Sequence, residues 1–299
     1  MTPNFSKIIL GTAQLGMPYG LGAWKNELMP EAEAFSILDA AWDLGVRTLD
    51  TSPNYGISEE RISNFLKLNP SKNFDIISKV KSVNEGAQQG VSVLEDWLNE
   101  SPLFDANTAN TISVLLHKED DIRHAAVIDT IQKFQMKGYF SCWGVSVYSQ
   151  AAAVETLDID PCQIIQLPFG ILNQSFQADG ILKTLSDHNK TILARSIFTQ
   201  GLLFGHKLEA LPITEEIHKI KRVIRDLSDR RGLTLMQFAI SFALSFDWVD
   251  SIVVGVDTVK QLNEAMKCPS CTLNEDELNV LYENSKSLLP DAVRPETWN

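Results

Sequence analysis

Residues 48–68 read TLDTSPNYGISEERISNFLKL, and this stretch decides the fold because it contains one complete strand–loop–helix unit. Thr48 and Leu49 form a short stretch typical of a buried strand, and a polar loop follows it. From Ser58 onward, apolar residues recur at three- and four-residue intervals, which predicts an amphipathic helix over 58–68. A strand followed by a helix is the repeating unit of parallel α/β folds.

Counting the quoted stretch, the chain contains eight such units in order. Strands are expected at 7–10, 48–49, 76–77, 112–116, 143–147, 164–165, 191–194 and 252–254. Helices are expected at 31–44, 58–68, 91–98, 125–136, 150–157, 180–188, 214–231, 235–246 and 259–266. Eight units in 299 residues predict a parallel α/β barrel, the (β/α)8 or TIM-barrel fold, as a single domain over 1–299.

A doubly wound sheet with a dinucleotide-binding glycine loop is the competing fold. Gly11-Thr-Ala-Gln-Leu-Gly16 follows the first strand, but its spacing differs from that fingerprint and a long loop follows it. The barrel is therefore favoured. The long loop, 15–30, is rich in Gly and Pro and contains Tyr19 and Trp24, so it is the candidate lid or substrate loop. A helical tail is expected over about 274–299.

Composition limits the class of protein. The net charge of −12 argues against nucleic acid as a partner, because nucleic-acid binders usually present a basic face. No apolar run is long enough to span a membrane, and the first residues lack the apolar stretch of a secretory signal. We therefore expect a cytoplasmic protein.

The four cysteines, Cys142, Cys162, Cys268 and Cys271, do not form a disulfide framework by their spacing. The last two make a CxxC pair, but a zinc site needs two more closely spaced ligands, and a redox motif normally opens a helix after an early strand. The five histidines form no ligand cluster in the sequence. Reduced thiols and no metal site are expected.

Four polar residues stand at or just past the ends of expected strands: Asp50, Tyr55, Lys79 and His117. The strand ends of a parallel barrel converge on one face, so distant residues can share one pocket. An acid, a phenol, an amine and an imidazole together can move a proton to or from an alcohol. Singly, each also fits a turn, a cap, a solvated strand end or a core histidine, but jointly they favour a catalytic site.

The segment from Asp50 to Glu59 resembles the Asp-x4-Tyr-Gly-x-Ser-Glu signature of the aldo-keto reductases. Further matching pieces follow in the family's order and rough spacing: Lys79, Leu115-Leu116-His117, Gly144-Val145-Ser146, Gln166, Arg195-Ser196, Gln200-Gly201-Leu202 and Val254-Gly255. The resemblance runs from about residue 8 to residue 266. It implies interconversion of a carbonyl and an alcohol with NADP(H) or NAD(H) as cofactor.

The resemblance also implies a role for each of the four polar residues. Tyr55 would donate a proton to the carbonyl oxygen, although an unperturbed phenol, with a pKa of about 10, holds its proton tightly. The ammonium of Lys79 would lower that pKa, and Asp50 would keep Lys79 charged and in place. His117 would orient the carbonyl or complete the proton path.

For the cofactor, the resemblance implies that Ser146 and Gln166 hydrogen-bond the nicotinamide carboxamide. It also assigns Gly11, Thr12, Asp50 and Ser196 to the cofactor site. Two residues depart from the family pattern. Val147 replaces a common Asn, and Arg195 replaces a Tyr that stacks on the nicotinamide. A cation there would disfavour the positively charged oxidised ring, so we expect a bias toward the reduced cofactor.

The segment after the eighth strand matches the family's adenosine-phosphate region. Gly255, Gln261 and Ala265 take places where many NADPH-preferring members have Lys, Arg and Asn around the 2′-phosphate, and Asp257 lies nearby. A carboxylate suits a ribose hydroxyl and repels a 2′-phosphate, whereas Lys260 would partly counter it. Alternatively, Asp257 caps the following helix. NAD(H) and NADP(H) therefore both stay open.

Two lysines bear on the substrate. Lys81 and Lys118 occupy positions that are often aromatic in family members that reduce hydrophobic carbonyls. If both reach the pocket, together with Tyr19 and Trp24 from the long loop, a small polar carbonyl compound, a sugar or a sugar acid is the expected substrate. Lysines at a barrel rim are also commonly just solvated.

Three other functions compete with the reductase. A cofactor-binding regulatory subunit on the same fold would show little or no turnover. A lyase or isomerase would use Lys79 as a Schiff base, but it leaves the Tyr-Gly-x-Ser-Glu motif and Arg195-Ser196 without a role. A metal-dependent hydrolase would need the ligand cluster that the sequence lacks.

Overall fold

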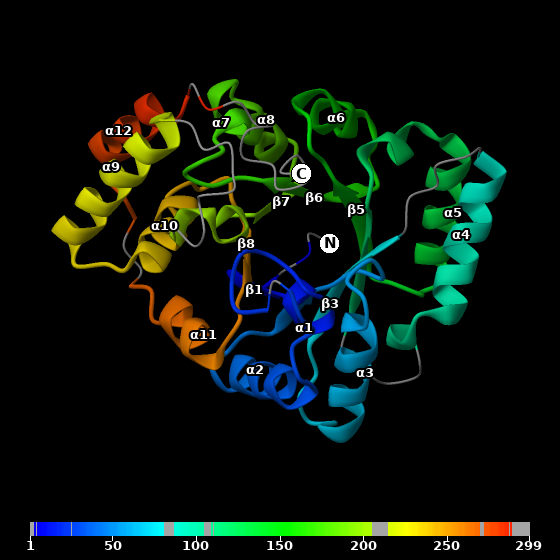
Figure 1. Cartoon of the computed structure of the whole chain (residues 1–299). Coiled ribbons are helices and arrows are strands. Elements are labelled where there is room, and N and C mark those ends of the chain that lie inside the picture. Colours follow the sequence, from blue (N-terminus) through cyan, green and yellow to red (C-terminus); the bar gives the residue numbers. More distant parts are fainter. Residues whose placement is uncertain are drawn as a thin grey trace.

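The computed structural model describes residues 3, 5–24, 26–80, 87–104, 109, 111–204, 215–269, 272–286 and 288. Eight parallel strands close into a barrel in sequence order, which confirms the predicted fold. The strands are β1 (Ile8–Gly11), β2 (Thr48–Asp50), β3 (Asp75–Val80), β4 (Ile112–Leu116), β5 (Cys142–Ser146), β6 (Cys162–Pro168), β7 (Thr191–Arg195) and β8 (Ser251–Gly255). In Figure 1 the helices surround these strands.

The described helices follow the predicted order, with several short additions at loops. They are α1 (Ala13–Gly16), α2 (Glu31–Asp43), α3 (Ser58–Leu68), α4 (Ala87–Glu100), α5 (Ala125–Met136), α6 (Gln150–Glu155), α7 (Ser175–Ala178), α8 (Ile181–Asp187), α9 (Glu215–Arg231), α10 (Leu235–Leu244), α11 (Val259–Met266) and α12 (Glu275–Ser285). Short 3-10 helices cover Pro102–Phe104, Glu119–Arg123, Thr156–Asp158 and Thr199–Phe204. The additions not expected from the sequence are α1, α7 and these 3-10 turns, all too short for a periodic pattern.

The expected helical tail is present as α12. It begins after Asn274, whose side chain accepts from the backbone N–H of Glu277 while the Glu277 carboxylate accepts from the backbone N–H of Asn274. This reciprocal capping box fixes the helix start. The rest of the expected tail, 289–299, lies outside the described residues.

Two layers of apolar side chains hold the barrel together. A large core lies between the strands and the surrounding helices, and it includes Ile62, Phe65 and Leu66 from α3. A small cluster of Ile9, Ile77, Leu115, Cys142, Ile164 and Leu193 contributes one residue from each of six strands. Because apolar side chains fill a barrel of this size, the polar residues gather where the strands end.

The strand register brings those ends level with one another. Gly11 at the end of β1 pairs with Asp50 of β2 and with Gly255 of β8. Ser146 at the end of β5 pairs with Gln166 of β6. Residues that are 20 to 244 positions apart along the chain therefore meet at one end of the barrel, by the numbering of these pairs.

Candidate active site

A cavity of about 980 Å³ lies at the carboxyl ends of the strands. Its lining contains most of the residues that the sequence predicts for the site: Gly11, Thr12, Tyr19, Asp50, Tyr55, Lys79, His117, Ser146, Gln166, Arg195, Ser196, Gly255, Asp257 and Gln261. This is the end at which (β/α)8 barrels carry their ligand sites. The four proposed catalytic residues and the proposed cofactor residues thus share one space.

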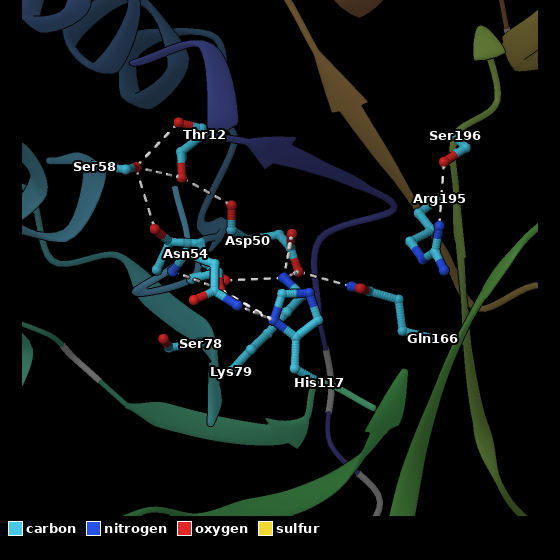
Figure 2. A network of polar contacts seen from close by, with 12 residues as sticks. Thr12, Asp50, Asn54, Ser58, Ser78, Lys79, His117, Gln166, Arg195 and Ser196 are labelled. Atoms are coloured by element: carbon cyan, nitrogen blue, oxygen red, sulfur yellow. Dashed lines mark hydrogen bonds and ion pairs between the residues drawn. The ribbon is translucent and has the colours of Figure 1, made fainter. Parts of the chain in front are cut away.

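Asp50 and Lys79 form a buried ion pair beneath this cavity. The Lys79 ammonium donates to both carboxylate oxygens of Asp50, at 2.8 and 2.9 Å, and to the carbonyl oxygen of Thr51 at 2.8 Å. Its three N–H donors are therefore all used. Burial lowers the pKa of Lys79, and the charge and hydrogen bonds of Asp50 oppose that shift. Figure 2 shows this pair among the polar contacts of the site.

Tyr55 lies with its ring beneath this ammonium. The Lys79 Nζ atom is 5.0 Å from the centroid of the Tyr55 ring. Burial raises the pKa of Tyr55 well above its ordinary value, the Asp50 charge adds to that rise, and the charge of Arg195 opposes it. The net shift of the Tyr55 pKa is therefore upward, whereas the sequence analysis expected Lys79 to lower it. The ammonium is neutralised by Asp50 at contact distance, so the pair exerts little positive field on the phenol.

His117 is held by the loop that follows β2. The side-chain amide nitrogen of Asn54 lies 3.1 Å from Nδ1 of His117, and the Ser52 hydroxyl lies 3.5 Å from the same atom. An amide NH₂ can only donate, so Nδ1 accepts and the ring proton of a neutral His117 is on Nε2. Burial lowers the pKa of His117 to about 3, and the charges of Lys79 and Arg195 contribute. The ring is therefore a neutral donor near neutral pH.

The turn that carries Tyr55 depends on a close approach of two glycines. Gly56 has a φ of +57°, and a Cβ atom there would collide with the carbonyl oxygen of Gly16. A Cβ atom on Gly16 would in turn collide with the carbonyl oxygen of Tyr55. Only glycine tolerates both the left-handed backbone and this contact at low cost. The Tyr-Gly part of the signature is thus explained by backbone geometry.

The Ser-Glu part of the signature anchors the same turn. The Ser58 hydroxyl donates to the Thr12 hydroxyl oxygen at 2.8 Å, and the Thr12 hydroxyl donates to the Asp50 carbonyl oxygen at 2.9 Å. The buried Glu59 carboxylate accepts from the hydroxyls of Ser78 and Ser101. Thr12 lines the cavity, but its hydroxyl already makes these two hydrogen bonds. Its side chain therefore positions the loop that carries Tyr55.

Gln166 and Ser146 provide polar atoms on the other side of Asp50. The Gln166 amide nitrogen donates to the Asp50 carboxylate at 2.7 Å. The side-chain carbonyl oxygen of Gln166 therefore points away from Asp50. That buried oxygen, Oε1, has no hydrogen-bond partner among the described residues. Ser146 is 1% exposed beside it in the sheet. A carbonyl acceptor and a hydroxyl together match a primary carboxamide such as that of nicotinamide, so these residues fit the cofactor that the resemblance implies.

Arg195 is held against an aromatic ring that the sequence analysis did not single out. Its guanidinium carbon lies 4.2 Å from the centroid of the Tyr148 ring, and Nη1 donates to the Ser196 hydroxyl at 3.3 Å. The other two nitrogens, Nε and Nη2, are buried and have no partner within the described part of the chain. Tyr148 stands two residues after Ser146, so its place at a strand exit was a signal in the sequence.

Asp257 joins the end of β8 to the loop that follows β1. Its carboxylate accepts from the backbone N–H of Ala23 at 3.2 Å, and its carbonyl oxygen accepts from the indole N–H of Trp24 at 3.0 Å. The loop is also joined to the 3-10 turn Thr199–Phe204 after β7, because the N–H of Leu21 donates to the carbonyl oxygen of Gln200 at 2.9 Å. The N-cap of α11 is Thr258, so Asp257 does not cap that helix.

Comparison with known proteins places the chain in a family. The aldo/keto reductase family model matches residues 7–284.

The chain belongs to the aldo/keto reductase family.

A D-threo-aldose 1-dehydrogenase from Pseudomonas sp is 26% identical, with 85% of this chain and 89% of that protein covered. An L-glyceraldehyde 3-phosphate reductase from Escherichia coli is 26% identical over a shorter part, 40% of this chain and 42% of that protein. An aldo-keto reductase from Bacillus halodurans, solved in a holo form, superposes with a TM-score of 0.74 at 18% identity, covering 99% of this chain and 96% of the other.

Membership in the aldo/keto reductase family makes this chain an oxidoreductase that interconverts carbonyls and alcohols. No helix in the described ranges is long and apolar enough to cross a membrane. Within the same ranges, no group of three or more His, Cys, Asp or Glu is arranged to hold a metal ion.

Two residues that the sequence analysis assigned to the substrate lie outside the cavity lining of this aldo/keto reductase. Trp24 packs partly buried against the main core and donates to Asp257, so it fastens the loop. Lys118 is exposed, directly before the 3-10 turn Glu119–Arg123. Its side chain is solvated rather than directed at the site, as is common for a lysine at a barrel rim. Lys81 lies outside the described residues.

Proposed function

We propose that the chain is an NAD(P)(H)-dependent oxidoreductase that interconverts a small polar aldehyde, ketone or sugar with the corresponding alcohol, using Tyr55 as general acid and base. The observation that carries this proposal is the arrangement of Tyr55 and His117 in one cavity, above the buried Asp50–Lys79 pair. A phenol and a neutral imidazole there can both donate a hydrogen bond to one carbonyl oxygen.

The nicotinamide cofactor, when bound, supplies or accepts the hydride. In this proposal, the unpartnered Gln166 carbonyl oxygen and the Ser146 hydroxyl hold its carboxamide. Gln166 is itself fixed by its donation to Asp50, so the orientation of the bound ring is linked to the catalytic ion pair. Gly11 and Gly255 pair across β1 and β8 and line this wall of the cavity.

Two side chains of the protein, Tyr55 and His117, take part in the proton transfer. Tyr55 keeps its proton in the buried site, so it is ready to donate to a carbonyl oxygen that becomes an alkoxide. Nε2 of His117 donates a second hydrogen bond to that oxygen, because Asn54 holds the proton on Nε2.

We further propose a preference for NAD(H) over NADP(H). The resemblance assigns the adenosine end of the cofactor to the region after β8. There, the cavity is lined by the carboxylates of Asp257 and Glu264, while Lys260 is exposed and absent from the described lining. A ribose hydroxyl can donate to a carboxylate, whereas a 2′-phosphate would be repelled.

Names of relatives support a polar substrate. One relative is named for aldoses and another for a phosphorylated glyceraldehyde. The lining of this cavity likewise carries many polar and charged side chains. We therefore propose small sugars or other polar carbonyl compounds as the substrate class.

Titration of the purified protein with NADH and with NADPH, followed by tryptophan fluorescence, tests the cofactor part. A panel of aldoses and small aldehydes, with consumption of reduced cofactor as readout, then tests turnover. Tight NADH binding with turnover of a polar carbonyl supports the proposal. Binding without turnover on the whole panel would instead favour a regulatory cofactor-binding subunit, and absence of binding by folded protein would reject both.

A further inference from the structure

One cation in the lining of the cavity is not neutralised by direct contact with a carboxylate of the described chain. The described lining holds two permanent cations, Lys79 and Arg195. Lys79 is paired with Asp50 at 2.8 Å. Nη1 of Arg195 donates to the Ser196 hydroxyl at 3.3 Å, whereas its Nε and Nη2 atoms are buried and have no hydrogen-bond partner among the described residues. Within the described structure, no contact compensates the positive charge of Arg195.

The charge of Arg195 acts on the catalytic residues. Burial is the main cause of the pKa shifts of Tyr55, Lys79 and His117. The charge of Arg195 contributes to each shift as well. It opposes the rise of the Tyr55 pKa, and it adds to the lowering of the pKa of Lys79 and of His117. Because a guanidinium stays protonated in proteins, the catalytic end of the cavity permanently disfavours a further positive charge.

Arg195 stands beside the place proposed for the carboxamide of the cofactor. Ile164 on β6 and Leu193 on β7 belong to the apolar cluster inside the barrel. Because side chains alternate along a strand, Gln166 and Arg195, each two residues further on, face the same interior. Gln166 pairs with Leu193 in the register, so Arg195 lies one side-chain step nearer the carboxyl end, on a strand about 4.8 Å away. Figure 2 shows Gln166 and Arg195 on the same side of Asp50. A ring whose carboxamide is held by Gln166 therefore lies close to the guanidinium.

Tyr148 and Ser196 hold this guanidinium in place. Its central carbon lies 4.2 Å from the centroid of the Tyr148 ring. The backbone N–H groups of Tyr148 and Ser149 both donate to the carboxylate of Glu119, at 2.5 and 2.9 Å, so the ring stands on an anchored backbone. Ser196, which accepts from Nη1, has a φ of +59°, a region that residues other than glycine rarely adopt. Stacking on a fixed ring reduces the freedom of the guanidinium and keeps its charge in one place.

We propose that Tyr148 is a positioning residue that holds the charge of Arg195 beside the nicotinamide end of the cofactor site, and that this pair makes the site bind the reduced cofactor more tightly than the oxidised one. The nicotinamide ring is positively charged when oxidised and neutral when reduced, so the guanidinium disfavours only the oxidised form. The sequence predicts such a bias from Arg195 alone, and the structure adds the ring that fixes the cation. This inference rests on the proposed function, because it requires the carboxamide to bind at Gln166 and Ser146.

Calorimetric titration with NADH and with NAD⁺ tests the effect of the Arg195 charge. The two forms share their adenosine, ribose and diphosphate groups, so the ratio of their Kd values isolates the nicotinamide end. We expect the wild type to bind NADH at least about tenfold more tightly than NAD⁺, because like charges at short range in a partly buried site repel strongly. Arg195→Gln should reduce this ratio about tenfold, mainly through tighter binding of NAD⁺, and Arg195→Lys should retain part of it. If NADPH binds more tightly than NADH, NADPH and NADP⁺ form the same comparison.

Two variants of Tyr148 test its positioning role. Tyr148→Leu removes the ring that holds the guanidinium, so the ratio of the two Kd values should fall by about threefold or more. Tyr148→Phe keeps the ring and should keep the wild-type ratio. A purely structural role would weaken the binding of NADH and NAD⁺ equally and leave the ratio unchanged. A ratio that does not fall in Tyr148→Leu therefore overturns the positioning role.

ADP-ribose and Lys118→Gln are the matched controls. ADP-ribose lacks the nicotinamide ring, so its affinity should be the same for the wild type and for Arg195→Gln. Lys118→Gln removes an exposed cation outside the described cavity lining and should leave the ratio of the NADH and NAD⁺ Kd values unchanged. If Arg195→Gln weakens ADP-ribose, NADH and NAD⁺ alike, the guanidinium binds the diphosphate instead, which overturns the proposal. A wild type with equal affinity for NADH and NAD⁺ overturns it as well.

Turnover measurements separate this inference from the proposed function. During carbonyl reduction, added NAD⁺ should inhibit Arg195→Gln more strongly than the wild type, because the variant lacks the repelling charge. An Arg195-dependent preference for NADH in protein that reduces no carbonyl would retain the inference and reject the proposed catalysis. Turnover of a polar carbonyl by protein that binds NADH and NAD⁺ equally would do the reverse. Absence of cofactor binding by folded protein would reject both.

Discussion

Asn54 donates its side-chain amide to Nδ1 of His117 over 3.1 Å, and this contact determines which ring nitrogen carries the proton. Both residues lie outside regular strands, on loops that follow β2 and β4. Because the amide can only donate, the ring of a neutral His117 presents Nε2–H to the cavity. The site therefore has a hydrogen-bond donor whose orientation is set by a residue within the signature loop.

Replacing Asn54 by Leu should lower kcat for carbonyl reduction by about tenfold, because the His117 tautomer is then no longer fixed. Cofactor affinity should change little, since Asn54 does not line the cavity. Steady-state kinetics and a fluorescence titration on the same preparation check both expectations. An unchanged kcat would show that Asn54 does not control the tautomer used in the reaction.

The reductive rate should be flat across neutral pH. Burial lowers the pKa of His117 to about 3 and raises that of Tyr55, so neither group changes protonation between about pH 5 and 9. A plot of kcat/KM against pH measures this directly. A transition near pH 6.5 that disappears in His117→Gln would contradict the account.

The same shift of His117 has a consequence for stability. The unfolded chain takes up a proton on this residue near pH 6.5, whereas the folded protein does so only at about pH 3. The stabilisation from neutral, buried His117 is therefore complete above pH 6.5 and is lost progressively as the pH falls toward 3. His117→Gln should lose less stability than the wild type on acidification over this window, measured by urea unfolding at several pH values.

The Asp50–Lys79 pair should behave as one unit in stability measurements. Lys79 and Asp50 are 1% and 4% exposed, so removing either partner leaves an uncompensated buried charge. Asp50→Asn or Lys79→Met alone should reduce the free energy of unfolding by about 3–5 kcal/mol, and the double variant should cost less than the sum. Strict additivity in urea unfolding would argue against the pairing. Asp187→Asn, which breaks the exposed pair with Lys183, is the control and should have little effect.

The sequence was most informative where local pattern and topology agree. Helix limits at α5 and α11 match the predicted 125–136 and 259–266, because amphipathic periodicity defines both and Thr258 caps the start of α11. The convergence of Asp50, Tyr55, Lys79 and His117 on one cavity was predictable from their positions at strand ends. Predicting this convergence requires only the order of the strands and helices along the chain, because all strand ends of a parallel barrel face the same side.

The directions of side chains and the pKa values of buried groups could not be predicted from the sequence pattern. Trp24 was assigned to the substrate, but its indole donates to Asp257 and packs on the core. Lys118 follows the catalytic histidine, yet its direction depends on the 3-10 turn that begins after it. The pKa of Tyr55 is raised by burial and by the charge of Asp50, and both depend on three-dimensional packing that the sequence does not define.

Asp257→Asn should raise the affinity for NADPH relative to NADH by about tenfold, because it removes a carboxylate from the region proposed for the 2′ position. Fluorescence titration with both cofactors gives the ratio. Asp160→Asn, an exposed residue before β6 and outside the cavity, controls for the change in net charge. If both variants shift the ratio equally, Asp257 does not determine cofactor preference.

The most direct test of the central claim is reduction of a polar aldehyde by wild type and Tyr55→Phe, with cofactor affinity measured on the same samples. Tyr139→Phe, which alters an exposed tyrosine, is the matched control. The account predicts that Tyr55→Phe loses turnover by a factor of about 10² or more while it binds the reduced cofactor as the wild type does. Turnover by Tyr55→Phe at the wild-type rate would contradict Tyr55 as the proton donor.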